Sequence, residues 1–119
     1  MEAPKKWVKA CQVADLPPGQ LRRVEVDALN TVTLVNVDGS FYALAGSCSH
    51  QNFPLWAGRV VKNRVVCPGH SWQFDACTGQ TLLPRDGDPV KTYPVRVEAD
   101  DVLIEWAPPP FVPRRRRTS

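Results

Sequence analysis

The sequence lacks long apolar runs and contains very few histidines. No stretch approaches the roughly 18 apolar residues of a membrane-spanning helix. The opening residues, Met1 to Trp7, also lack the apolar segment of a secretory signal, so we expect a cytoplasmic protein. Only 2 of the 119 residues are His and 4 are Cys. With so few candidates for metal ligands, their positions carry most of the information.

Length and charge predict one domain with a distinct C-terminal tail. A chain of 119 residues fits a single core. The net charge is +3, but Arg114 to Arg117 supply four positive charges, which leaves 11 basic and 12 acidic residues elsewhere. We predict a folded domain over residues 1–107 and a flexible Pro- and Arg-rich tail over 108–119. The nearly neutral body offers no basic stripe for nucleic acid, and the tail fits either a solvated end or a docking arm for an acidic partner.

Each histidine follows a cysteine at loop spacing. His50 lies two positions after Cys48, His70 lies three positions after Cys67, and 16 residues separate the two pairs. Two thiolates and two imidazoles suit a pair of irons in which one iron binds both sulfurs and the other binds both nitrogens. We therefore predict these four residues as the ligands of a 2Fe–2S cluster.

Two other uses of Cys and His fit this spacing less well than the cluster does. Structural zinc sites usually pair Cys with Cys and His with His, or use four Cys, whereas each half here mixes the two residue types. A nucleophilic Cys with a His base needs one residue of each kind and leaves the second pair unexplained. A zinc module is therefore the weakest reading of the chain as a whole.

The residues around both pairs resemble the cluster loops of Rieske-type 2Fe–2S ferredoxins from bacterial aromatic oxygenase systems. The similarity extends from about residue 7 to residue 106. It is carried by Cys48-Ser49-His50-Gln51, Cys67-Pro68-Gly69-His70-Ser71-Trp72-Gln73-Phe74-Asp75, Cys77-Thr78-Gly79 and Tyr93-Pro94-Val95-Arg96-Val97-Glu98. The resemblance implies one Rieske-type cluster, with Cys48 and Cys67 on the inner iron and His50 and His70 on the outer iron.

The resemblance also implies a function. Members of that family are soluble one-electron carriers rather than enzymes, which pass electrons from a flavin-dependent NAD(P)H reductase to a terminal oxygenase, either a dioxygenase or a diiron monooxygenase. It implies no small-molecule substrate, nucleic acid or membrane partner. The alternative is a small Rieske subunit of an enzyme such as nitrite reductase, or a detached Rieske domain of a terminal oxygenase. A terminal oxygenase also needs a mononuclear iron site with two His, and neither His is left for one.

The pattern of branched apolar residues predicts an all-β protein without a ten-residue helix. Asp38-Gly39 is a strong signal for a tight hairpin, and a further turn is expected at 75–79. Short strands at this spacing suggest an antiparallel sandwich or partly open barrel. The resemblance specifies the Rieske fold, a β base carrying a cluster-binding subdomain from about Ala45 to Leu82. The expected strands cover 24–26, 32–37, 41–45, 60–61, 64–66, 72–74, 93–98 and 102–106.

Departures from high-potential relatives bear on the loops and on the reduction potential. Those relatives have a disulfide between the loops at the positions of Phe53 and Gly69, so the two loops must hold together here without it. They also carry hydroxyl side chains at the positions of Trp72 and Phe74. Since both hydroxyl donors are missing, we expect a potential of roughly −200 to −80 mV, at and slightly below the low end of the band of about −150 to +300 mV.

The remaining expectations concern residues around the cluster. Three glycines and a proline either let backbone N–H groups approach the sulfides or form ordinary turns: Gly46, Gly58, Gly69 and Pro68. An apolar collar is expected from Phe53, Pro54, Leu55 and Trp72, with Trp72 equally suited to the core. Cys11 and Cys77 are expected as buried or spare thiols, and Trp7, Trp56 and Trp106 as core residues.

Overall fold

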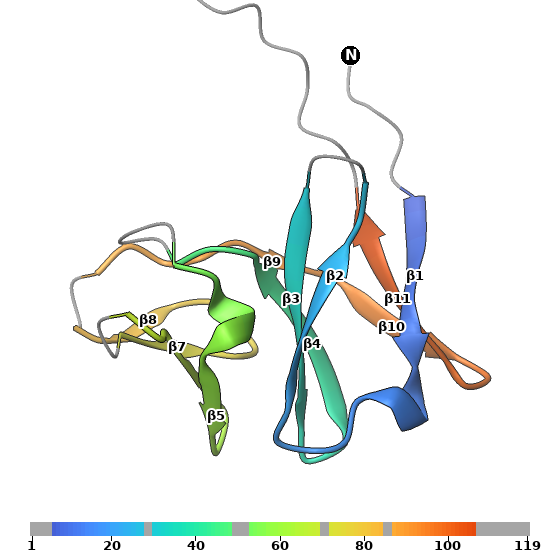
Figure 1. Ribbon diagram of the computed structural model, residues 1–119, viewed down its shortest axis with the longest axis horizontal. Coiled ribbons are helices and arrows are strands. Elements are labelled where there is room, and N and C mark those ends of the chain that lie inside the picture. Colours follow the sequence, from blue (N-terminus) through green and yellow to red (C-terminus); the bar gives the residue numbers. More distant parts are fainter. Residues whose placement is uncertain (1–5, 28–29, 49–52, 70–71, 85–86, 107–119) are drawn as a thin grey trace, which may run out of the picture.

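The computed structural model describes residues 6–27, 30–48, 53–69, 72–84 and 87–106, which form three antiparallel sheets (Figure 1). The predicted all-β antiparallel architecture is confirmed. None of the helices in these ranges is long and apolar enough to cross a membrane. The first sheet has the order β1 (Lys6–Gln12), β11 (Asp101–Trp106), β10 (Val95–Glu98); the second β2 (Leu21–Glu25), β3 (Thr31–Val37), β4 (Ser40–Ala45), β9 (Thr92–Tyr93); and the third β5 (Arg59–Val61), β6 (Arg64–Val66), β7 (Gln73–Asp75), β8 (Thr81–Leu83). Two short 3-10 turns, η1 (Val13–Asp15) and η2 (Leu55–Ala57), complete the elements.

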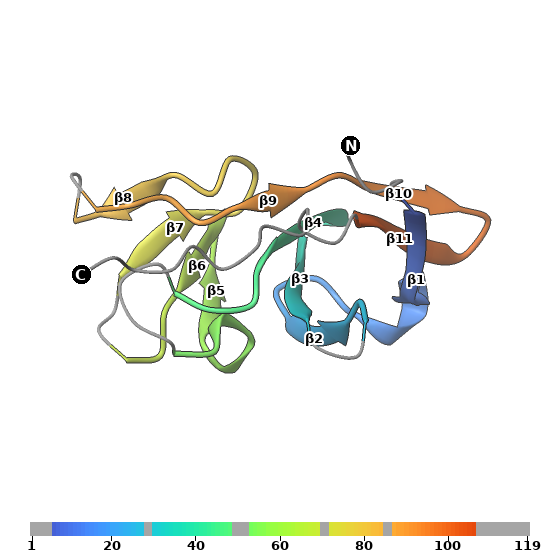
Figure 2. The same ribbon diagram turned by 90° about the horizontal axis from the view of Figure 1, so that it is seen from above.

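The second sheet lies between the other two (Figure 2). Val32 and Leu34 of β3 belong to the apolar core shared with the first sheet, whereas Val35 of the same strand belongs to the core shared with the third sheet. Side chains alternate between the faces of a strand, so β3 contributes to both cores. Its residues from Val32 to Asn36 are all buried.

The predicted Asp38-Gly39 hairpin is confirmed. Val37 of β3 pairs with Ser40 of β4, which leaves Asp38 and Gly39 as a two-residue connection. Both have positive φ, 53° and 93°, as a turn matched to the twist of the strands requires. This hairpin aligns β4, the strand that leads into the first Cys-His pair.

The single strand expected over residues 93–98 is instead two strands separated by Pro94. Proline has no backbone N–H, so Pro94 cannot donate to a ladder, although its carbonyl accepts a hydrogen bond from the Glu105 N–H at 2.9 Å. β9 pairs with β4, and β10 pairs with β11. The chain therefore changes from the second sheet to the first at this proline, and Figure 2 shows it running along the length of the molecule.

Two strands were not predicted. β1 follows the sequence KWVKACQ, in which charged residues interrupt the apolar ones, and it lies at the edge of its sheet beside β11. β8 has only three residues. Neither segment carries the sustained period-two pattern that identifies a strand from sequence.

The three tryptophans predicted as core residues differ in exposure. Trp106 is buried, with its ring 5.4 Å from that of Tyr93 and its Nε1–H donating to Asp27 Oδ2 at 3.2 Å. Trp56 is half-buried. The prediction is wrong for Trp7, which is 37% exposed on β1 and lies 4.3 Å beneath the guanidinium of Arg96.

The strands test the predicted domain limits only in part. The third sheet spans residues 59–83, inside and slightly beyond the predicted subdomain of 45–82. The tail at 108–119 lies outside the described residues. The division of the chain therefore stays a prediction.

Candidate metal centre

The first ligand loop leaves the end of β4 and is closed by backbone hydrogen bonds. The Cys48 N–H donates to the Phe53 carbonyl at 2.9 Å, and the Leu55 N–H donates to the Gly46 carbonyl at 2.9 Å. Between these bonds, Ser47 and Pro54 form an isolated antiparallel bridge. The sequence Cys48-x-His50 therefore lies within a loop whose two ends are held side by side.

The second ligand loop is the connection between β6 and β7. Val66 pairs with Gln73, and the Cys67 N–H donates to the Trp72 carbonyl at 2.8 Å. Arg64 reinforces the hairpin, because its guanidinium donates to Gln73 Oε1 at 2.8 Å. Cys67 is thus at the point where the hairpin opens, in the same relation to its loop as Cys48 is to the first.

The structure brings the two predicted cysteine ligands into one apolar core. Cys48 and Cys67 are 4% and 2% exposed, and both belong to the cluster of buried side chains that includes Leu55, Val65 and Phe74. An apolar environment disfavours a thiolate unless a cation stabilises it. Two buried thiols from separate loops therefore suit a group that supplies iron to both, which agrees with the predicted cluster.

The two histidines lie outside the described residues. His50 and His70 fall in the intervals 49–52 and 70–71. Their assignment as ligands rests on their positions two residues after Cys48 and three residues after Cys67. It stays a prediction.

The glycines near the loops allow segments of backbone to pack closely. A Cβ at Gly46 would lie 2.7 Å from the Thr31 carbonyl oxygen, and a Cβ at Gly58 would collide with the Val66 carbonyl oxygen. Gly58 therefore lets η2 approach β6 immediately before Cys67. These contacts explain Gly46 and Gly58 by packing of the protein itself, rather than by access to the sulfides. Gly69 faces the ring of Phe53.

The predicted apolar collar is confirmed only in part. Phe53, Pro54 and Trp72 are half-buried, but Leu55 is fully buried and belongs to the core. The Trp72 ring lies 6.2 Å from that of Phe74. Trp72 is therefore at the boundary between core and surface.

One part of the collar was missed from the sequence. Gly87 lies against Trp72, since a Cβ at Gly87 would be 2.7 Å from the indole ring. The Gly87 N–H donates to the Pro84 carbonyl at 3.1 Å, and Leu83, just before Pro84, is 51% exposed. Pro84 and Gly87 enclose a turn signal, but nothing in the sequence shows that this turn packs against Trp72.

The two remaining cysteines lie in different environments. Cys11 is buried in the core of the first and second sheets, and burial raises the pKa of its thiol, while Arg22 lowers this pKa and Asp15 raises it by smaller amounts. Cys77 is exposed in the turn after β7, where its N–H donates to Asp75 Oδ1 at 2.8 Å. Cys11 is thus a buried small apolar residue and Cys77 an exposed thiol.

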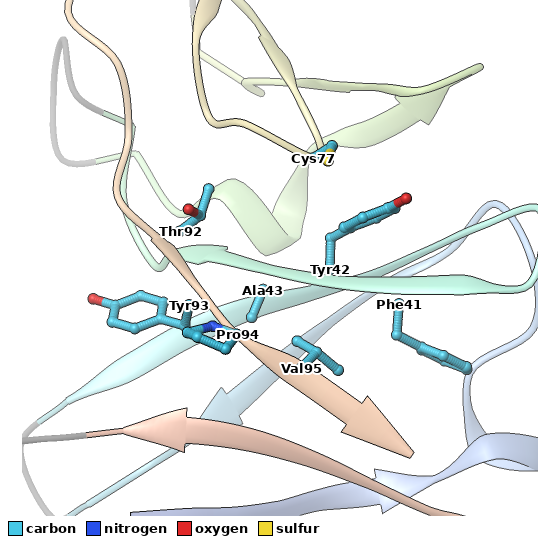
Figure 3. A pocket seen from close by; sticks show the side chains of 8 residues that line it. All are labelled: Phe41, Tyr42, Ala43, Cys77, Thr92, Tyr93, Pro94 and Val95. Atoms are coloured by element: carbon cyan, nitrogen blue, oxygen red, sulfur yellow. The ribbon is translucent and has the colours of Figure 1, made fainter. Parts of the chain in front are cut away.

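A surface cavity of about 450 Å³ lies where the chain changes sheets (Figure 3). It opens between β4 and β10, because β9 pairs with β4 while β10 turns away to pair with β11. Cys48 and Cys67 do not line it. The lining residues are Phe41, Tyr42, Ala43, Cys77, Thr92, Tyr93, Pro94 and Val95.

Comparison with known proteins identifies a matching family. The model of the family described as Rieske [2Fe-2S] domain matches residues 6–94, a range that includes both ligand loops, the second and third sheets and strand β1 of the first sheet.

Individual relatives match over most of their length. The biphenyl dioxygenase ferredoxin subunit of Pseudomonas sp. (strain KKS102) is 37% identical over 102 residues, which are 85% of this chain and 93% of that protein. The Sphingomonas yanoikuyae B1 ferredoxin has a TM-score of 0.78 and 31% identity, covering 85% of this chain and 99% of the other. A chain in the complex of reduced oxygenase and oxidized ferredoxin in carbazole 1,9a-dioxygenase has a TM-score of 0.78 and 28% identity, covering 82% and 91%.

Proposed function

Because this chain belongs to the Rieske [2Fe-2S] domain family and is a ferredoxin rather than an enzyme, we propose that it carries single electrons from a flavin-dependent NAD(P)H reductase to the terminal oxygenase of an aromatic-ring dioxygenase system. Its cofactor is one Rieske-type 2Fe–2S cluster. The observation that carries the proposal is the meeting of Cys48 and Cys67, from two separately closed loops, in one buried core.

We assign Cys48 and Cys67 to the inner iron and His50 and His70 to the outer iron. When bound, the cluster supplies a site that accepts and releases one electron, at a potential set partly by hydrogen bonds to its sulfurs. The protein's own residues hold the two loops together and keep water from the sulfur side through Leu55, Val65 and Phe74. The loops belong to the proposed cluster-binding subdomain, residues 45–82.

The names of relatives support a terminal oxygenase as the partner that accepts the electron. One similar protein is a subunit of biphenyl dioxygenase, and one similar structure is a complex between an oxygenase and a ferredoxin. Both names favour a dioxygenase over a diiron monooxygenase as the electron acceptor. The proposal includes a cytoplasmic location, where NAD(P)H is available and reducing conditions suit the four cysteines.

The first test is electron paramagnetic resonance of the purified protein after dithionite reduction, with iron and acid-labile sulfide counted on the same sample. We expect a rhombic signal and about two irons and two sulfides per chain. Stopped-flow absorbance would then follow reduction by NADH with a candidate reductase and reoxidation by a dioxygenase component. A colourless protein that stays without signal after anaerobic reconstitution contradicts the cofactor, whereas a reducible cluster that no oxygenase reoxidises contradicts only the partner.

A further inference from the structure

We propose that the ring of Phe53, packed against Gly69, is the contact that fixes the two ligand loops relative to each other, so that Phe53 is a positioning residue for the cluster. This inference rests on the ligand assignment proposed above. Phe53 lies three residues after His50, and Gly69 lies directly before His70. The contact therefore joins the two loops at residues that are close in sequence to the predicted histidine ligands.

Phe53 is itself held at the first loop. Its carbonyl accepts the hydrogen bond from the Cys48 N–H at 2.9 Å, and the next residue, Pro54, is bridged to Ser47. The start of the Phe53 side chain is therefore fixed relative to Cys48. Any group that the ring touches is positioned relative to that cysteine.

Gly69 occupies the corresponding place in the second loop. It lies two residues after Cys67, within the loop closed by the hydrogen bond from the Cys67 N–H to the Trp72 carbonyl at 2.8 Å. A Cβ at Gly69 would lie 2.7 Å from Phe53 Cγ and nearer still to Cδ2 and Cε2 of the ring. Real Cβ atoms essentially never approach other atoms so closely, so the ring occupies the space that a side chain at residue 69 would need.

Other contacts near the loops do not replace this one. The hydrogen bonds that close the loops each join residues of a single loop, Cys48 to Phe53 and Cys67 to Trp72. The close approach of Gly58 to the Val66 carbonyl joins the segments where the loops begin and end, which lies on the strand side of the cysteines. Among the described residues, the Phe53–Gly69 contact is the one nearest in sequence to both predicted histidines.

The geometry also permits a covalent substitute. Phe53 Cγ is one C–C bond, about 1.5 Å, from Phe53 Cβ, and the Cβ built at Gly69 is 2.7 Å from that Cγ. The two Cβ atoms are therefore at most about 4.2 Å apart, below the upper limit of about 4.5 Å found in disulfides. A pair of cysteines at these positions is therefore close enough for a disulfide to be tested.

The first experiment is a double-mutant cycle on the cluster-loaded protein, with Phe53→Ala, Gly69→Ala and both together. The readouts are the half-life of the visible absorption in the presence of a chelator and the line shape of the reduced electron paramagnetic resonance signal. We expect each single variant to shorten the half-life about tenfold or more and to broaden the signal. The double variant should be no worse than the poorer single one, because both changes break the same contact.

The matched control is Phe41→Ala, which removes another half-buried phenylalanine, one that packs against the core of the first and second sheets. Its half-life should equal that of the wild type. Equal half-lives and spectra for Phe53→Ala and the wild type overturn the proposal, as does strict additivity in the double variant. Cys48→Ala separates the two hypotheses: if it retains the cluster, the ligand assignment fails, and if only Phe53→Ala is silent, the positioning role fails.

The second experiment covers the case in which Phe53→Ala fails to load. Phe53→Cys/Gly69→Cys is loaded with the cluster and treated with oxidised glutathione, which takes the two electrons released when the two thiols lose their protons and form the disulfide. Mass spectrometry verifies the bond. We expect the bonded form to regain the wild-type half-life and the form reduced by a thiol to lose it. Failure of the bond to form, or equal half-lives for both forms, contradicts the proposal.

Discussion

The molecule has two regions that differ in the length of their longest strands. We define the base as the first and second sheets, and the cluster region as the third sheet with the two ligand loops. Strands β1 and β3 of the base have seven residues each, whereas all four strands of the third sheet have three. The base core contains one cysteine, Cys11, which is not a predicted ligand, whereas the core of the cluster region contains both predicted cysteine ligands, Cys48 and Cys67. We therefore expect the base to fold by apolar burial alone and the cluster region to depend on iron as well.

Cys48→Ala should have the largest effect and tests this difference directly. We expect complete loss of the cluster, with amide hydrogen exchange accelerated in β5 to β8 while β3 and β11 stay protected. The measurement is hydrogen exchange by mass spectrometry, with visible absorption on the same sample. Cys77→Ala, in an exposed turn, is the control and should keep the cluster. Equal loss of protection in both regions would remove the distinction drawn here.

Ile104→Ala should weaken the base without changing the metal centre. Ile104 is fully buried in the core of the base, and truncation of such a side chain costs about 2–5 kcal/mol. Urea unfolding followed by circular dichroism measures the free energy of unfolding. Leu103→Ala, on a half-buried neighbour, should cost less. A changed electron paramagnetic resonance spectrum in Ile104→Ala would show that the two regions are coupled more tightly than their separate cores suggest.

Phe74→Tyr should change the cluster region without changing the base. Phe74 is fully buried in the core that contains both cysteines, and we expect a hydroxyl added there to donate to one of the sulfurs. We expect the potential to rise by about 40–60 mV, the one-electron equivalent of a hydrogen bond worth about 1–1.4 kcal/mol. Potentiometric titration monitored by absorbance measures it. Phe41→Tyr in the base is the control, and a rise of equal size there would rule out the local explanation.

Thr33→Val should have the smallest effect, and it acts on the strand that both regions share. Thr33 Oγ1 is buried and has no hydrogen-bond partner among the described residues. Replacing an unsatisfied hydroxyl by a methyl group of similar shape should raise the free energy of unfolding by about 1 kcal/mol. Thermal unfolding measures the change, with Thr31→Val, on a half-buried residue, as the control. A loss of stability would show that the hydroxyl has a partner.

Local sequence signals predicted the turns and the hairpin that frame the candidate site. The Asp38-Gly39 turn, the hairpin at 60–66 and the turn at 75–79 each depend on neighbouring residues, and the structure has all three. The family resemblance, rather than a local signal, implied that the loops carrying Cys48 and Cys67 would meet. Their burial in one core agrees with that prediction.

Features that depend on distant segments were beyond the sequence. The change of sheet at Pro94 depends on two distant strands, because the residues before it pair with β4 and the residues after it pair with β11. The exposure of Trp7 follows from the edge position of β1. The packing of Phe53 on Gly69 and of Gly87 on Trp72 joins loops separated by 15 or more residues. None of these contacts leaves a periodic or turn signal in the chain.

The burial of β3 on both faces has a consequence for redesign. Because Val32 and Leu34 pack into one core and Val35 into the other, the cluster region cannot be excised and transplanted as an independent module without exposing a strand face. The exchangeable parts are instead the segments that leave the sheets, residues 46–55 and 67–72. Chimeras that swap these segments between relatives should vary the electron affinity of the centre while the three sheets stay the same.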